Sequence, residues 1–143
     1  MTTKTHEVRL AIQSRLASLR PENNKASNIQ AVLNPIEARK KDNIPTAGRY
    51  AVLWTLDGQS QSGNANAVLW KQDWAVDIPV DWEVDSEQLL DKIKVELASA
   101  LLPKIEGVKE QSLGSLQISY PAGGSGRAVV SIEFTTVYVE TLS

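Results

Sequence analysis

The segment that most constrains the fold lies near the end of the chain, at residues 127–140, with the sequence RAVVSIEFTTVYVE. It contains neither Gly nor Pro and is rich in β-branched and aromatic residues, which favour a pleated, half-buried strand. Strands usually have about 5–6 residues, so this one is predicted to be unusually long. Residues 68–80 predict a second long strand. Long strands in a small domain have ladder groups that need covering, and we expect a neighbouring subunit to cover them.

Length and composition limit the class of protein. The 143 residues are enough for one domain with a substantial core, and we predict a single domain over residues 1–143. The net charge of −2 argues against a dedicated nucleic-acid-binding protein, which is usually basic. With no cysteine and one histidine, we expect neither a metal nor a cofactor. No apolar run is long enough to span a membrane and the first residues do not resemble a signal peptide, so we expect synthesis in a cytoplasm.

Hydrophobic periodicity predicts the order of the elements. Helical stripes lie at residues 5–19 and 85–102. Strand patterns lie at residues 50–56, 68–80, 116–120 and 127–140. We therefore predict an α+β fold in the order α-β-β-α-β-β, with a mainly four-stranded antiparallel sheet and two helices packed on one face. Residues 21–48 and the hairpin tip at 57–66 are predicted to project as loops. The aliphatic residues within 29–36 form either a short helix or a segment lying along a partner.

Alternation within the strands assigns side chains to the two faces of the sheet. In residues 50–56 we expect one face to pack on the core, formed by Tyr50, Val52, Trp54 and Leu56. In residues 68–78 the same pattern places Trp70 and Trp74 in the core. An acidic series follows from the opposite face of this strand onward, namely Asp73, Asp77, Asp81, Glu83 and Asp85. Its spacing is typical of a solvated strand face, and it does not match a calcium-binding loop.

Catalytic motifs are absent from the sequence. The segment GGSG at residues 123–126 lacks the Lys-Ser/Thr of a phosphate-binding loop and joins two strands, so it is interpreted as a hairpin turn. No nucleophile and base can be paired by spacing. We therefore expect that the chain is not an enzyme.

The candidate functional residues are those suited to contacts with a partner. The basic cluster of Arg39, Lys40 and Lys41, with Lys25 upstream, either contacts phosphates or an acidic neighbour, or is a solvated run of charge. Trp82 is either an exposed interface anchor or packs under the second helix. The remaining candidates are two residues of the polar tip and one at the start of the last strand: Gln59, Gln61 and Arg127.

The layout of the chain resembles the tail terminators of tailed bacteriophages, the tail-completion proteins similar to minor tail protein U. The resemblance is carried by the first helix at 8–19, the helix at 85–102 after an acidic turn, and the closing segment ISYPAGGSGRAVVSIEFTTVYVE. It implies a structural virion protein that forms a homo-oligomeric ring of about six copies. Such a ring, assembled in the host cytoplasm, ends polymerisation of the tail tube protein and joins the tail to the head connector. DNA would pass through it without sequence-specific binding.

Two alternatives remain open at this point. The first is another head–tail joining protein or a tail tube subunit, which would share the long strands and the charge. The second is a cytoplasmic module that binds a small ligand in a Trp-lined pocket between the sheet and the helices.

Overall fold

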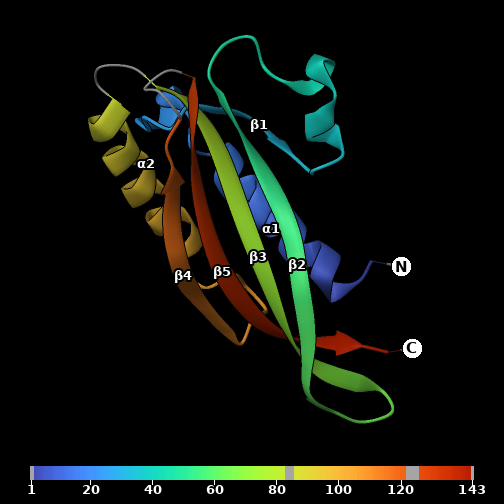
Figure 1. Cartoon of the computed structure of the whole chain (residues 1–143). Helices are drawn as coiled ribbons and strands as arrows, with labels where there is room; N and C mark the ends of the chain where they lie inside the picture. Colours follow the sequence, from blue (N-terminus) through green and yellow to red (C-terminus); the bar gives the residue numbers. More distant parts are fainter. Residues whose placement is uncertain (1, 83–85, 122–125, 143) are drawn as a thin grey trace.

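The computed structural model describes residues 2–82, 86–121 and 126–142 (Figure 1). Within these residues, two α-helices, five strands and three short 3₁₀ helices (η) follow one another. Their order is α1 (Lys4–Ala17), η1 (Pro21–Asn23), β1 (Ile29–Leu33), η2 (Glu37–Arg39), η3 (Lys41–Asn43), β2 (Arg49–Gly63), β3 (Ala67–Asp81), α2 (Ser86–Leu101), β4 (Glu110–Ser119) and β5 (Arg127–Thr141). The predicted cap at Asp85 and most of the GGSG turn lie outside the described residues.

The fold is α+β, as predicted, but its sheet has five strands in the order β1-β2-β3-β5-β4 and is mixed. The expected four-stranded antiparallel sheet was wrong because β1, predicted as a short helix or a partner-binding segment, pairs in parallel with β2. Ile29 and Leu33 of β1 are buried. Parallel neighbours need a crossover of a dozen or more residues, and the long connection with η2 and η3 supplies it.

The hairpin of β2 and β3 is longer than predicted. The segment at 57–66 was expected to be a projecting loop, yet β2 continues to Gly63 and pairs through Gln59 with Lys71 and Ser60 with Trp70. Backbone groups make these bonds, so polar side chains do not prevent them. The ladder is irregular between Thr55 and Gly58 and again after Ser60. Likewise, β4 begins at residue 110, earlier than the predicted 116.

The long strand β5 lies inside the sheet. It pairs with β3 over residues 127–141 and with β4 over residues 129–137. Its ladder groups are therefore largely satisfied within the chain, and the expectation that a neighbouring subunit covers this strand was wrong. In the described part of the chain, the free edges belong on one side to β1 and to β2 beyond its short pairing with β1, and on the other side to β4. These two edges bound opposite sides of the sheet.

Both helices pack on the same face of the sheet, as predicted (Figure 1). The core alternates along β3 and β5, where Trp74, Phe134 and Tyr138 are almost fully buried. The helices contribute a stripe each, formed by Val8, Ile12 and Leu16 of α1 and by Leu90, Ile93, Leu97 and Leu101 of α2. Each such apolar side chain stabilises the fold by about 1.5–3 kcal/mol through burial.

The first turn of α1 is held by the last strand. The backbone N–H groups of Lys4 and Thr5 donate to the carboxylate of Glu140, at 2.7 and 3.2 Å, and the Thr5 hydroxyl also contacts Tyr138. Thr3 caps the same turn by accepting from the His6 N–H. A carboxylate beside helix N–H groups interacts favourably with the helix dipole. The two ends of the described chain are thus joined.

Replacing Thr136 with Val tests the one buried polar pair at the centre of β3 and β5. The Trp74 indole N–H donates to the Thr136 hydroxyl at 2.9 Å, and both residues are fully buried. Thr136→Val leaves this donor unpaired, so we expect the free energy of unfolding to fall by about 1–3 kcal/mol. Urea denaturation measures it. In a Trp74→Phe background, which has no indole N–H, the same substitution should cost less than half as much; equal costs would contradict the role of the bond.

Candidate interaction surface

The face of the sheet opposite the helices is largely uncovered, and we call it the open face (Figure 1). Side chains of β3 and β5 that alternate with the core residues point to it, among them Lys71, Asp73, Asp77, Glu133 and Val139. At one end, Ile44 and Pro45 from the long connection share a hollow with Tyr50 and Pro79. The rest of this face is available for contact with another molecule.

Trp54 belongs to the open face, and the prediction that it lies in the core was wrong. In β2 the core positions are Ala51 and Leu53, whereas Trp54 is 39% exposed and pairs with Ala75. Its indole N–H donates to the Asp77 carboxylate at 2.9 Å. The segment YAVLWTL has apolar residues at both odd and even positions, so alternation could not decide which face points to the core. The larger residues lie at the even positions, and their size favoured the wrong face. Leu56, also predicted as core, is 39% exposed as well.

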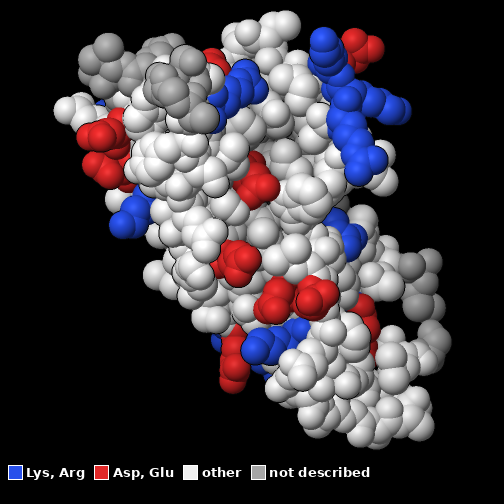
Figure 2. Space-filling model, in the orientation of Figure 1, with Lys and Arg blue, Asp and Glu red and all other residues white. Residues whose placement is uncertain are grey.

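Three carboxylates gather on this face. Glu133 pairs with Ala75, which lies between Asp73 and Asp77 on β3, so the three side chains form a triangle across two strands. We call them the acidic triangle. Asp73 accepts from the Thr135 hydroxyl at 2.7 Å, and Asp77 accepts from Trp54. Within the described residues none of the three forms an ion pair. Figure 2 shows acidic side chains spread over this side of the molecule.

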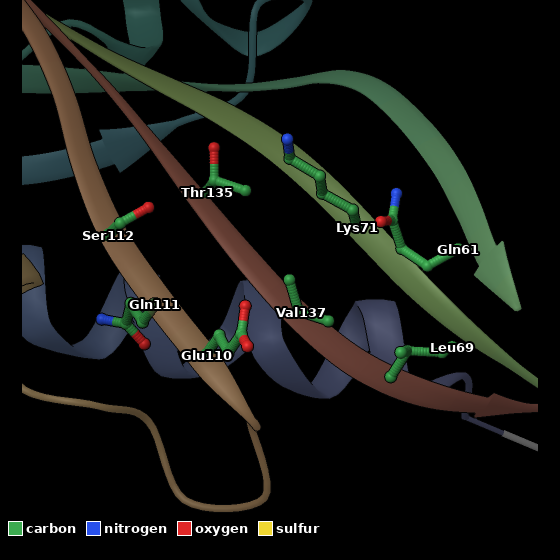
Figure 3. Close-up of a pocket in the computed structure, with 8 residues that line it drawn as sticks. All are labelled: Gln61, Leu69, Lys71, Glu110, Gln111, Ser112, Thr135 and Val137. Atoms are coloured by element: carbon green, nitrogen blue, oxygen red, sulfur yellow. The ribbon is translucent and has the colours of Figure 1, made fainter.

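A shallow hollow of about 330 Å³ lies toward the β2–β3 hairpin tip (Figure 3). Its lining is mostly polar and comes from four strands: Gln61, Leu69, Lys71, Glu110, Gln111, Ser112, Thr135 and Val137. Lys71 and Glu110 are the charged groups on its rim. No tryptophan lines it. The expected Trp-lined space between sheet and helices is filled at Trp74, which is fully buried and stacks on Phe134 with ring centroids 6.5 Å apart.

The predicted contact residues fall in different places. Gln59 and Gln61 are exposed on β2, and Gln61 lines the hollow. Arg127, at the start of β5, forms an ion pair with Asp81 at 2.9 Å. Trp82 is half-buried against the core and meets Tyr120 edge to face, with ring centroids 5.2 Å apart, which favours its packing interpretation.

The exposed cations Arg39, Lys40 and Lys41 are brought together by η2 and η3, and we call them the basic segment. Figure 2 shows Lys and Arg side chains gathered at this end. The backbone before them is fixed, because Asn34 and Glu37 each donate an N–H to the other's side chain at 2.9 and 2.8 Å. Within the described residues, these three cations form no ion pair.

Lys25 lies apart from the basic segment, beside Glu96 of α2. The Glu96 carboxylate accepts from the N–H groups of Ala26 and Ser27, both at 2.8 Å, and from the Ser27 hydroxyl at 2.6 Å. Arg49 donates to the carbonyl oxygens of Ala26 and Ser27 from the other side. The start of the long connection is therefore fastened to α2 and β2.

Electrostatics at this fastening follow from burial and bonding. Burial raises the pKa of Glu96, but the bonds from Ser27 and Ala26 and the charge of Lys25 outweigh it, so the pKa is lowered below its ordinary 4.5. Burial lowers the pKa of Arg49, and the carboxylates of Asp81 and Glu96 oppose this. Arginine remains charged at neutral pH in either case.

Two structural findings bear on other kinds of site. Within residues 2–82, 86–121 and 126–142, no three His, Asp or Glu side chains converge as metal ligands would. In the same part of the chain, no helix has the length and apolarity needed to cross a bilayer.

Comparison with known proteins assigns no family. No family model matches the chain, and no curated protein matches it. One solved structure, whose name states no function, aligns over 98% of this chain and 96% of its own length, at 11% identity and a TM-score of 0.46. A likeness this weak supports no conclusion about this protein.

Replacing Glu96 with Gln should loosen the base of the long connection. We expect the free energy of unfolding at pH 7 to fall by about 1–2 kcal/mol, a reduced value because the carboxylate is partly exposed. The lowered pKa means that this stabilisation is complete above pH 4.5 and is lost as pH falls through the folded-state pKa. The difference between wild type and Glu96→Gln should therefore shrink in acid, as measured by urea denaturation. Asp91→Asn, which makes the same change of charge at an exposed position of this helix, is the control variant.

Proposed function

We propose that this chain is a structural subunit that assembles with copies of itself into a closed ring, and that the ring is a tail terminator of a tailed bacteriophage. The observation that carries the proposal is the sheet itself. Its open face is uncovered, and its free edges at β2 and β4 lie on opposite sides. Unpaired strand edges are surfaces that native proteins usually protect. Neighbouring copies would protect them here.

The geometry favours a repeated contact between unlike surfaces. Because the two free edges bound opposite sides of one sheet, a single copy can meet one neighbour at each side. A repeated contact of this kind closes into a ring when the rotation between copies divides a full turn, and otherwise extends into a filament. A closed ring offers no site for a further copy, and this property would let it end the growth of a tube.

Projecting parts of the fold supply candidate contacts on either side of such a ring. The β2–β3 hairpin ends at residues 64–66, far from the η2–η3 segment at the other end of the sheet (Figure 1). We assign these ends to the two partners that a terminator joins, the tail tube protein and the head connector. DNA would pass through the ring without sequence-specific contacts. The protein would then reside in the virion, at the head-proximal end of the tail.

The mass in solution tests this proposal. The monomer has a mass of 15.7 kDa, and we expect light scattering to give one species of about six subunits whose mass does not rise with protein concentration. Negative-stain images of that fraction should show a ring with a central pore. Added to polymerising tail tube protein, the ring should stop elongation.

Other outcomes point to the alternatives. Open-ended polymers that lengthen with concentration would contradict a terminator and favour a tube subunit. A ring that leaves tube growth unchanged would favour another head–tail joining protein. A monomer that retains a small molecule would replace the proposal with a ligand-binding module, for which the hollow beside Lys71 and Glu110 is the first place to examine.

A further inference from the structure

Two surfaces of opposite charge lie at separate places on this chain, and among the described residues neither takes part in an ion pair. The acidic triangle of Asp73, Asp77 and Glu133 lies on the open face, and the basic segment of Arg39, Lys40 and Lys41 lies on η2 and η3 beside the sheet. Within the described residues no ion pair joins them. The two surfaces are therefore complementary in charge, but they do not contact each other within one copy of the chain.

The surroundings of the triangle restrict what can bind there. Trp54 donates to Asp77 and presents an indole ring that is 39% exposed beside the triangle. An occupant must therefore carry positive charge and also apolar surface. Long Lys and Arg side chains meet both needs, since their stems lie along apolar surface and their heads form ion pairs. Nucleic acid is repelled by the carboxylates.

The basic segment is built to present its cations outward. Glu37, the carboxylate within the same turn, is engaged by the Asn34 N–H at 2.9 Å, and Asn43 donates its side-chain amide to the Glu37 carbonyl at 3.0 Å. These bonds, with the backbone bonds of the two turns, hold the short helices in shape without using the side chains of Arg39, Lys40 or Lys41. Asp42 is the remaining exposed carboxylate of the segment. The segment also projects beside the free edge of β2 rather than over the open face (Figure 1).

We propose that the basic segment of one copy docks on the acidic triangle and Trp54 of the next copy, and that this is the contact repeated around the ring. The inference rests on the proposed self-assembly and names the surfaces that perform it. The two surfaces differ, so the contact is heterologous, as ring closure requires. Complementary charge also fixes the register between copies and disfavours a face-to-face dimer, in which two acidic triangles would meet.

Charge exchange between two variants tests the contact. The first variant carries Arg39→Glu, Lys40→Glu and Lys41→Glu, and the second carries Asp73→Lys, Asp77→Lys and Glu133→Lys. Each presents like charges at its own contact, so each alone should sediment as a monomer at 0.1 M salt. Mixed in equal amounts, the two should form rings of alternating copies, because each basic surface again meets an acidic one. Light scattering and negative stain measure both results.

Two controls separate the contact from folding and from charge in general. Replacing Lys92, Lys94 and Lys104 with Glu makes the same change of charge on exposed positions of α2 and the loop after it, and assembly should be retained. Circular dichroism melting checks that each variant is folded. If the second variant does not fold, the single substitution Glu133→Lys replaces it. Glu133 is exposed, and its side chain forms none of the hydrogen bonds described above.

The outcomes distinguish this inference from the proposed function. If the wild type forms rings and either charge-reversed variant forms them equally well, the contact is wrong and the terminator proposal stands. Rings lost in each variant without recovery on mixing would also overturn the contact. A wild type that stays monomeric overturns both. If reversal of the basic segment abolishes binding to duplex DNA while rings persist, the segment faces DNA instead of a neighbour.

Discussion

The structure depends on the antiparallel ladder between β3 and β5. It runs from Ala67 paired with Thr141 to Asp81 paired with Arg127 without a register shift, whereas the ladders on either side are interrupted. An unbroken ladder keeps the parity of both strands constant over their whole length. Every second residue therefore faces the helices, from Trp70 to Val80, and the residues between them face away. The core and the open face are two consequences of this one pairing.

The division between faces also explains the placement of charge. Polar residues on the core side are few and paired: Thr136 accepts from Trp74, and Gln72 donates to backbone carbonyl groups of β2. Glu140 also faces the helices, where it bonds to the first turn of α1. The carboxylates Asp73, Asp77 and Glu133 lie on the other side, where solvent stabilises them in the free chain. Like charges on neighbouring strands still repel one another. The acidic triangle is thus tolerated in the monomer and becomes more favourable when cations approach it.

The sequence predicted some parts of this fold well for physical reasons that can be named. Both helices were found because their stripes at Val8, Ile12 and Leu16 and at Leu90, Ile93 and Leu97 repeat at helical spacing. The long strand β5 was found because Arg127–Thr141 has no residue that interrupts a strand. The strand β1 was missed because five residues among prolines and asparagines carry little periodic signal, and its pairing with β2 is non-local. The end of β2 was missed because Gln59, Ser60 and Ser62 contribute backbone bonds only.

The candidate surface was predicted less completely. The basic segment could be read directly from three adjacent cations, but the acidic triangle depends on strand register, which places Glu133 beside two residues more than fifty positions earlier. Trp54 was assigned to the wrong face because an apolar segment without alternation does not show which residues face the core.

The bonds from Lys4 and Thr5 to Glu140 have a consequence for how the protein is made. β5 lies between β3 and β4, yet it follows every other element along the chain, so during translation the sheet lacks an inner strand until residues 127–141 emerge from the ribosome. The first helix cannot acquire its capping carboxylate before then. Contacts between residues 136 positions apart slow the start of folding. They also keep folding cooperative, because a partial chain lacks residues that complete the core. Until β5 has emerged, the acidic triangle also lacks Glu133, which this strand supplies.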